Sequence, residues 1–343
     1  MFLPVRLNID KFLLYLVCTV VLASLLPISG RYAEWFSIAT TIAIGMLFFL
    51  HGARLSPRTV VKGMTHWRLH LVIFLTTFGL FPVLGLIIGL LSPALLSPAL
   101  YTGILFLCVL PSTVQSSIAF TSIGGGNVAA AICSATASNI LGMFITPVLL
   151  GLVLSVNADA GAGPSPGAIG NILMQLLAPF LLGQLLQPWI GQWVREHKAP
   201  LTIVDRGSIL MVVYLAFSEA IVGGLWQHVD GVSIATMIVV DCVLLALVLL
   251  ITRTVSRLMG FSREDEVAIV FCGSKKTLAS GVPMANVLFP AAQVGSALLP
   301  LMLFHQIQLF VCAMLARRYA TRRAAATAQA QTTSSNASSG VGI

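Results

Sequence analysis

Charged side chains are scarce in this sequence. Of its 343 residues only 9% are charged and 11 are acidic, whereas 57% are hydrophobic. An ordinary soluble domain has about 25% charged residues. The shortage of charge therefore excludes a typical water-soluble protein and indicates a membrane protein.

Several motifs that would signal other functions are missing as well. The six cysteines fall in apolar segments and form no close CxxC pair, so they indicate neither a disulfide framework nor a metal site. The glycines at 124–126 lack the GK[ST] that completes a phosphate-binding loop. No nucleophile and base are spaced for hydrolysis, and we predict neither an enzyme nor a resident cofactor.

The sequence does contain a series of long apolar runs. A helix needs about 20 residues to cross about 30 Å of hydrocarbon, and the runs are continuous, unlike the alternating segments of a β-barrel. We predict an all-α polytopic membrane protein with ten transmembrane helices, at residues 12–30, 33–51, 69–91, 101–120, 127–156, 168–190, 207–225, 232–252, 264–287 and 292–316.

The basic residues set the orientation of these spans. If the amino terminus is cytoplasmic, all but three of the 19 Lys and Arg residues lie in cytoplasmic segments, which are 1–11, 52–68, 191–206, 253–263 and 317–343. This excess predicts an even number of spans with both termini on the cytoplasmic side of a bacterial inner membrane. The net charge of +8 then reports topology, and we predict no nucleic-acid partner.

Two segments divide the chain into units. "NADAGAGPSPG", residues 157–167, is rich in Gly, Pro and Ala and predicts a flexible periplasmic linker. It separates residues 1–156 from 168–316. Each unit would hold five spans, and because five is odd the second unit would be inverted relative to the first, as in many secondary transporters. Residues 317–343 are polar towards their end and predict a disordered cytoplasmic tail.

The polar stretch "LPSTVQSS" interrupts the fourth predicted span. Pro111 removes a backbone donor, and the polar residues after it are Ser112, Thr113, Gln115, Ser116 and Ser117. In hydrocarbon such groups need protein or water around them. A proline-kinked helix whose hydroxyls bond to the preceding turn would explain one or two of them. Five polar positions in six favour a substrate or ion site on unwound backbone.

A second polar stretch, "CGSKKTLASG", occupies the matching place in the ninth span, with Ser274, Lys275, Lys276 and Thr277. A lysine at the membrane centre costs about 2.5 to 3.5 kcal/mol, and these two lie roughly 15 Å from either end of the span, too deep to snorkel. We predict that one lysine enters a site while the other meets a carboxylate or the carbonyls of a broken helix. The alternative is a misplaced helix boundary that leaves both lysines in water.

Other polar residues inside the spans are few. Glu219 and Asp241 are the acids well inside spans and are the candidate charge partners of the lysines. The acids at 264–266 begin the ninth span, where they complement the helix dipole and indicate capping. His305, Gln306 and Gln308 either line the same cavity or make packing hydrogen bonds.

Small residues form a stripe along the fifth predicted span. They recur at three- or four-residue multiples, at Asn127, Ala131, Ser134, Ser138 and Gly142. Such stripes are typical of close helix packing, although the amide of Asn139 needs partners of its own. A binding role for Ser134, Ser138 or Asn139 is the alternative.

At "LPSTVQSSIAFTSIGGGNVAAAICSATASNILG" and "CGSKKTLASGVPMANVLF" the chain resembles the bile acid:sodium symporter family, over about residues 8–318. Within that family it is most similar to a bacterial symporter branch that also has a vertebrate member. The resemblance implies a panel domain and a core domain, with helices 4 and 9 discontinuous and crossing at the midplane. It also implies alternating access by movement of one domain against the other.

The sodium ligands of the family carry over in part. By position, the resemblance implies sodium ligands at Ser116 and Ser117 and, most nearly, at Ser134 and Ser138. The Glu and Gln that the family has on its ninth span have no counterpart in residues 274–277. A fixed ammonium there could take the place of the cation and repel a second one, so both sodium and the proton are candidate coupling ions.

These features predict a secondary active transporter, a symporter, that moves an organic, anionic or amphipathic solute across the membrane. The expected partners are this small-molecule solute and the lipid bilayer. The alternative is a non-transporting regulatory or scaffold membrane protein that retains the transporter fold.

Overall fold

The computed structural model describes residues 11–54, 66–91, 96–156, 166–222 and 230–339, and these form helices without a strand. Six stretches are long and apolar enough to cross a membrane. They lie in α2 (Gly30–Arg54), in the run of α4 (Trp67–Leu75), η2 (Thr76–Leu80) and α5 (Phe81–Ile88), in α8 (Val128–Val156), in α10 (Lys198–Val222), in α12 (Gly231–Leu258) and in α15 (Ala291–Ser339). The chain is therefore a polytopic membrane protein.

Two of the predicted spans are each broken into a pair of short helices. The predicted span 101–120 consists of α6 (Pro98–Val109) and α7 (Gln115–Ile123), and the predicted span 264–287 consists of α13 (Arg263–Gly273) and α14 (Leu278–Leu288). The chain between the members of each pair is not helical. The interruptions fall at the two polar stretches that the sequence singles out.

The remaining helices among the described residues are α1 (Lys11–Leu25), the short η3 (Gly89–Leu91) and α9 (Pro166–Glu196). The first ends earlier than the predicted span 12–30, because Pro27 disfavours a helical conformation of the residue before it. Of the predicted linker, residues 157–165 lie outside the described residues.

Capping side chains begin several helices, among them α12 and α13. The Asp230 side chain accepts a hydrogen bond from Ser233 N at 2.8 Å at the start of α12. The hydrogen bonds from Ser233 lower the pKa of the Asp230 carboxyl, so the cap is ionised at neutral pH. Ser262 caps α13, and the acids at 264–266 lie in its first turn, as predicted.

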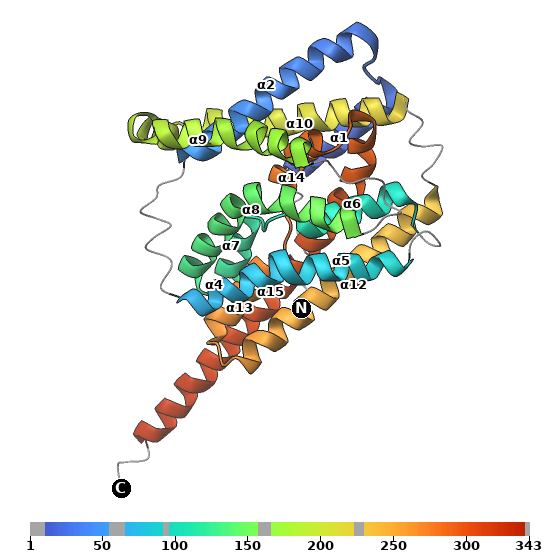
Figure 1. Cartoon of the computed structure of the whole chain (residues 1–343). Helices are drawn as coiled ribbons and strands as arrows, with labels where there is room; N and C mark the ends of the chain where they lie inside the picture. Colours follow the sequence, from blue (N-terminus) through green and yellow to red (C-terminus); the bar gives the residue numbers. More distant parts are fainter. Residues whose placement is uncertain (1–10, 55–65, 92–95, 157–165, 223–229, 340–343) are drawn as a thin grey trace.

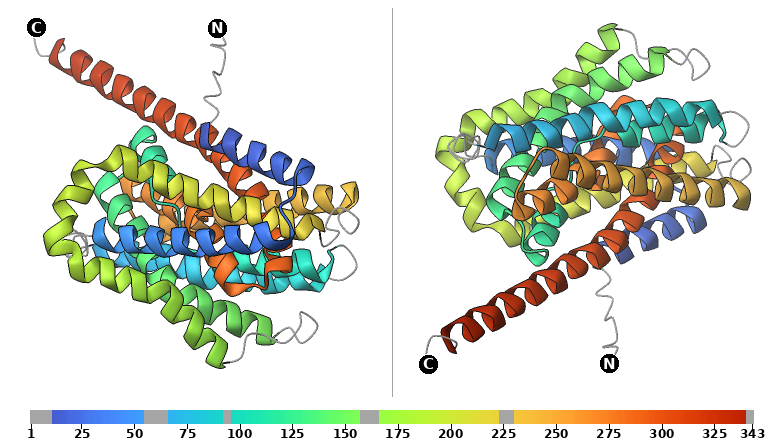
Figure 2. Two further views of the ribbon diagram at one scale, coloured as in Figure 1. Left: turned by 90° about the horizontal axis from the view of Figure 1, so that it is seen from above. Right: turned by 90° about the horizontal axis from the view of Figure 1, so that it is seen from below.

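The helices form two packed groups. Helices α1, α2, α9 and α10 pack against one another at one side of the molecule, and α4 to α8 with α12 to α15 form the other group (Figure 1). The first group is tightly joined at Gly52 and Gly183, where a Cβ on either glycine would collide with the backbone of the facing helix. Views at right angles show the same grouping (Figure 2). Helices α10, α14 and α15 provide contacts between the groups.

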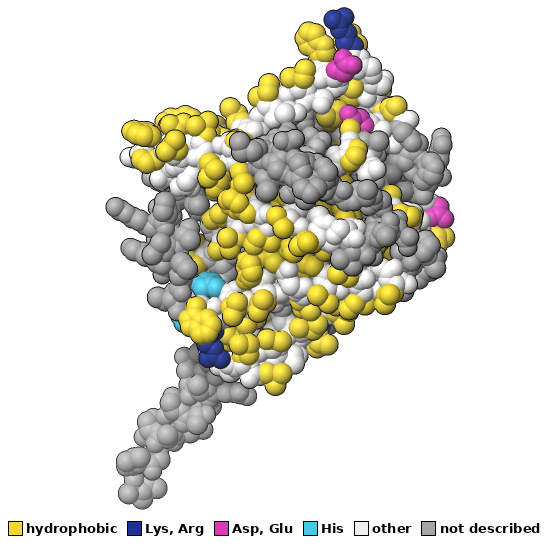
Figure 3. Space-filling model, viewed as in Figure 1, with side chains coloured by type: hydrophobic (Ala, Val, Ile, Leu, Met, Phe, Trp, Pro, Cys, Tyr) yellow, Lys and Arg dark blue, Asp and Glu magenta, His cyan; other side chains and the backbone are white. Residues whose placement is uncertain are grey.

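The surface suits a lipid environment. Large apolar side chains such as Leu25, Trp35 and Leu258 are more than two-thirds exposed, and Figure 3 shows hydrophobic side chains over much of one face, with charged groups near its ends. Contiguous exposed apolar surface of this kind marks contact with a membrane or a partner.

The end of the chain differs from its prediction. Helix α15 continues to Ser339 and projects away from the bundle (Figure 1), whereas the sequence predicts a disordered tail from residue 317. The segment 316–330 is rich in Ala and Arg, which have high helix propensity. It also continues a membrane helix, so no new helix nucleus has to form.

Candidate functional site

The two helix breaks, residues 110–114 and 274–277, meet at one place, which we call the crossing. Polar groups of each break cap the helix ends of the other. At the end of α6 the carbonyl groups lack helical partners, as the last carbonyls of any helix do. Thr277 N, from the second break, donates to Pro111 O at 3.0 Å. Thr146 Oγ1 of α8 donates to Val109 O at 2.9 Å. The backbone of one break is therefore held by the backbone of the other.

Lys276 bonds two further carbonyls at the end of α6. Its Nζ donates to Cys108 O at 2.8 Å and to Leu110 O at 2.7 Å, and a third bond reaches Thr77 O at 2.8 Å. The ammonium also lies 4.1 Å from the centroid of the Phe81 ring. An ammonium has three N–H donors, so Lys276 is fully buried with every donor used.

The Thr77 carbonyl is available to Lys276 because of a π-turn in η2. Phe81 N, which would pair with Thr77 O in an α-helix, bonds instead to Thr76 O. The next residue, Pro82, has no N–H to offer. Single π-turns are frequent at functional sites, and here the turn supplies the third ligand of a buried cation.

The capping is reciprocal at the end of α13. Ser112 Oγ, from the first break, donates to Cys272 O at 2.6 Å, and Ser117 Oγ donates to Phe271 O at 3.1 Å. Hydroxyl groups from the first break thus satisfy the last carbonyls of α13, while an ammonium and an amide from the second break satisfy those of α6. Both breaks are stabilised by polar groups that either chain segment alone would leave unpaired in the membrane.

Lys275 lies on the other side of the second break and has a different environment. Its Nζ is fully buried and has no hydrogen-bond acceptor among the described residues. It lies 3.8 Å from the centroid of the Phe120 ring and 5.7 Å from that of Phe271. The two lysines therefore have different neighbours, and a cation–π contact stabilises Lys275.

Helix α15 holds the second break in place. Lys276 N donates to Gln308 Oε1 at 2.9 Å, and Gln308 Nε2 donates to Lys276 O at 2.8 Å. Gln308 also lies 2.8 Å from His305 Nδ1. Gln308 thus bonds to the backbone of Lys276, and His305 is joined to it through Gln308.

The remaining predicted residues of the breaks are brought together in part. Thr113 Oγ1 lies 2.7 Å from Ser116 Oγ and 3.1 Å from Ser117 Oγ. Gln115 is exposed and stands apart from this cluster. Ser274 Oγ donates to the backbone of its own helix, at Val270 O.

The stripe on α8 faces the first break. Ser138 Oγ accepts a hydrogen bond from Ser112 N at 3.1 Å, which links α8 to the crossing. Asn139 has the partner its amide requires, because its Oδ1 accepts a bond from Ser280 Oγ at 2.8 Å. The stripe therefore serves close packing and polar contact together.

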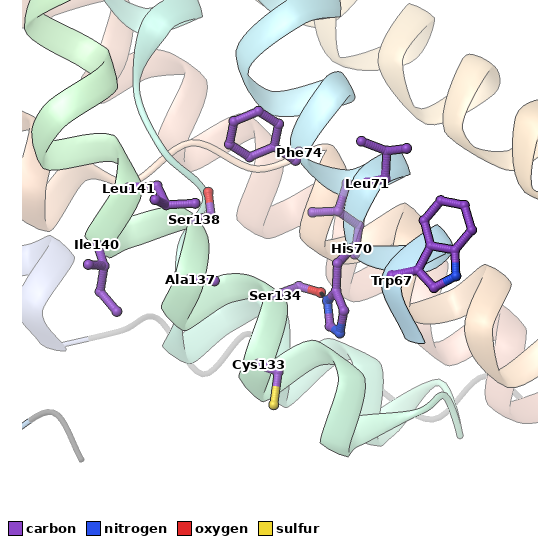
Figure 4. Close-up of a pocket in the computed structure, with 11 residues that line it drawn as sticks. Trp67, His70, Leu71, Phe74, Cys133, Ser134, Ala137, Ser138, Ile140 and Leu141 are labelled. Atoms are coloured by element: carbon purple, nitrogen blue, oxygen red, sulfur yellow. Dashed lines mark hydrogen bonds between the residues drawn. The ribbon is translucent and has the colours of Figure 1, made fainter. Parts of the chain in front are cut away.

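Ser134, in contrast, turns to a cavity between α4 and α8. Its Oγ lies 2.6 Å from His70 Nδ1, and Figure 4 shows the two side chains pointing toward each other. The cavity has a volume of about 540 Å³ and is mostly apolar; its lining includes Trp67, Leu71, Phe74, Ser138 and Leu141. Pockets of several hundred Å³ are the usual size for organic ligands.

The candidate charge partners of the lysines are placed differently from the prediction. Asp241 is fully buried in α12 and Glu219 is half-buried in α10, and no ion pair joins either acid to a lysine among the described residues. The lysines instead use carbonyl groups and aromatic rings. A helix break supplies such carbonyls without requiring an acid.

Where α12 ends and α13 begins, another acid forms an ion-pair cluster. Glu266 lies 2.9 Å from Arg257 and 3.7 Å from Arg253, and it accepts a hydrogen bond from Tyr319 at 2.8 Å. Asp265 accepts a bond from Asn127 at 2.8 Å. The acids of this turn therefore join helices as well as capping α13.

Sequence reasoning missed several residues of the site. Thr77, Thr146 and His70 lie on helices that are distant in sequence from the breaks, and their side chains or carbonyls complete it only in the folded chain. The nearest signal is Pro82, whose missing N–H would leave the carbonyl of Phe78 unpaired in an α-helix; the π-turn transfers the free carbonyl to Thr77.

Replacing Gly142 should test the packing of α8 against the first break. A Cβ there would lie 2.6 Å from Cβ and Cγ of Pro111, a rigid ring. We expect Gly142→Ala to destabilise the protein by roughly 1 to 3 kcal/mol. Gly45→Ala is the matched control, because nothing lies within 4 Å of a Cβ at Gly45 and alanine favours a helix. Thermal unfolding in detergent would compare them, and equal melting temperatures would contradict this packing.

A membrane bundle in which two helix breaks meet and bond to each other is typical of one class of protein, the secondary transporters. Comparison with known sequences gives the family. A sequence model of the SBF-like CPA transporter family matches residues 10–321, and the chain belongs to that family.

Three relatives illustrate the similarity. An uncharacterised protein of Pseudomonas aeruginosa is 55% identical over 324 residues, which cover 94% of this chain and 97% of the relative. "Putative symporter YfeH" of Escherichia coli is 51% identical over 311 residues, covering 91% and 93%. Sodium/bile acid cotransporter 7 of the rat is 28% identical over 319 residues, covering 90% and 92%.

Proposed function

We propose that the protein is a secondary active transporter that moves an organic, anionic or amphipathic solute across the bacterial inner membrane by alternating access. The observation that carries this proposal is the pair of mutually capped helix breaks, with a fully coordinated ammonium between them. Polar groups buried this deeply in a membrane are expensive and usually mark a transport pathway. Membership in a family of transporters supports the same function.

The two helix groups are the proposed moving parts. In the part of the chain that the structure describes, the group of α1, α2, α9 and α10 holds no broken helix, whereas both breaks lie in the other group. Movement of one rigid group against the other would expose the crossing to each side in turn. The reciprocal pattern of capping supports two inverted repeats of five spans, residues 1–156 and 168–316, and the distribution of the basic residues supports cytoplasmic termini.

The cavity between α4 and α8 is the proposed place of the solute. It is mostly apolar, and its polar side chains include His70, Ser134 and Ser138. Ser138 also bonds to Ser112 N in the first break. A solute in this cavity would therefore be linked to the crossing through the hydrogen bond between Ser112 N and Ser138 Oγ.

The proton is the proposed coupling ion. Lys276 already brings a positive charge to three carbonyl oxygens, and a sodium ion near it would be repelled. These contacts favour protons over sodium.

Uptake into proteoliposomes tests the proposal. The panel should run from small carboxylates to amphipathic sulfonates, with imposed pH or sodium gradients. A gradient of one pH unit stores about 1.4 kcal/mol per proton, enough for about tenfold accumulation of a solute moved with one proton. We expect such accumulation with the pH gradient and none added by sodium. Absence of uptake across the panel would favour a regulatory or scaffold protein.

A further inference from the structure

Asp241 is a buried acid that forms no hydrogen bond with the described residues of the crossing. It lies in α12, roughly 15 Å along the helix axis from Gly231. Its side chain is fully buried, and neither carboxyl oxygen has a hydrogen-bond partner among the described residues. No other acid in the described part of the chain has both oxygens buried without a partner.

An ionised carboxylate in this position would be strongly unfavourable. Burial of a charge without donors requires several kcal/mol, and folded proteins pair nearly all their buried polar groups. A carboxyl group avoids most of this penalty by holding a proton. Acids that persist inside membrane spans commonly belong to proton pathways.

No ion pair joins Asp241 to another charged group among the described residues. Helices α13 and α15 and the π-turn η2 pack against α12. The cluster of Glu266 with Arg253 and Arg257 is 12 to 16 residues farther along α12, about 18 to 24 Å away. Tyr319 belongs to that cluster through its bond to Glu266.

The other titratable groups on these elements have neighbours of their own. Cys272 Sγ lies 3.8 Å from Ala131 O, Cys312 packs with Val270 and Phe271, and His305 contacts Gln308. The π-turn η2 carries no titratable side chain.

Lys276 is linked to the helix of Asp241 through the π-turn η2. The π-turn η2 packs against α12, the helix of Asp241, and its Thr77 carbonyl accepts a hydrogen bond from Lys276 Nζ. The carbonyl oxygens of Thr77, Cys108 and Leu110 form a cage around the ammonium of Lys276. A negative charge on Asp241 would compete with this carbonyl cage for the ammonium.

We propose that Asp241 is the proton-binding group of the transport cycle. It holds its proton in the present conformation. When water reaches it, the carboxyl O–H bond breaks heterolytically, the proton passes to water, and the carboxylate left behind attracts the ammonium of Lys276 away from its carbonyl ligands. This inference rests on the proposed function, because it assigns the coupling proton to a residue.

Infrared spectroscopy tests the proton site without any transport. Protein with isotopically labelled aspartate carbons at neutral pH should show the carbonyl band of a protonated carboxyl, shifted by the label. Asp241→Asn should abolish that band, whereas Glu219→Gln, the matched change at a half-buried acid of α10, should leave it intact. Absence of the labelled band in the wild-type protein, or its survival in Asp241→Asn, would overturn the proposal. The wild-type measurement decides even if the variant fails to fold.

Transport then tests the coupling. Asp241→Asn should reduce the stimulation of uptake by a pH gradient at least tenfold, and Glu219→Gln should keep it. Unchanged stimulation in Asp241→Asn would refute the coupling role. If no solute is transported by wild type, the proposed function fails while the infrared result still decides whether Asp241 holds a proton.

Discussion

Replacing Lys276 with methionine will destabilise the protein, whereas the same change at Lys275 will not. Methionine is close to lysine in length but has no N–H donor, so Lys276→Met leaves the carbonyls of Thr77, Cys108 and Leu110 unpaired in a buried site. Each unsatisfied buried acceptor costs about 1 to 3 kcal/mol. Removal of a buried charge offsets part of this, and we expect a net loss of about 2 to 3 kcal/mol.

The neighbouring lysine provides the control for this change. Lys275 is just as buried but has no hydrogen-bond acceptor among the described residues, and its contacts are with aromatic rings. Methionine sulfur also packs favourably against aromatic rings. Lys275→Met should therefore leave the stability unchanged or raise it, because an uncompensated buried charge is lost.

Thermal unfolding of the purified variants in one detergent measures both effects. The two substitutions are chemically identical and adjacent in sequence, so a difference between them reports on the carbonyl cage. Equal losses of melting temperature would mean that the cage adds nothing to the stability of the crossing.

The positions of the breaks could be predicted from the sequence, because their signals are local. Pro111 and the hydroxyl residues after it interrupt an apolar run, and residues 274–277 interrupt another. A run of polar residues in hydrocarbon has few structural solutions, since its backbone must find partners inside the protein. The structure places non-helical chain at both stretches.

The partners of the lysines could not be predicted in the same way. An acid is the obvious partner for a buried lysine, and Glu219 and Asp241 were the available acids. The actual ligands of Lys276 are backbone carbonyls, which every residue has and which no sequence pattern marks as free. Which carbonyl is unpaired depends on where a helix ends, on a π-turn, and on how distant segments cross.

The carbonyl cage itself should accept a separate cation once its own lysine is removed. Lys276→Ala deletes a three-carbon chain with its ammonium, and propylammonium reproduces that fragment. The three oxygens resemble carbonyl sites that replace the hydration shell of a monovalent ion. A ligand that binds only the folded state stabilises it by about 2.7 kcal/mol at 100 times its dissociation constant.

We therefore expect millimolar propylammonium to raise the melting temperature of Lys276→Ala in a saturable manner, with sodium giving a smaller rise. Wild-type protein and Lys275→Ala are the controls. Neither should respond, because the cage is occupied in both by the ammonium of Lys276. In transport, Lys276→Ala should lose most of its uptake and recover part of it with the added amine. An equal response of all three proteins would show a general salt effect and remove the basis for treating Lys276 as a tethered cation. A selective response would mean that this chain carries, as a covalent part of its own helix break, the positive charge that a coupling ion would otherwise bring to the crossing.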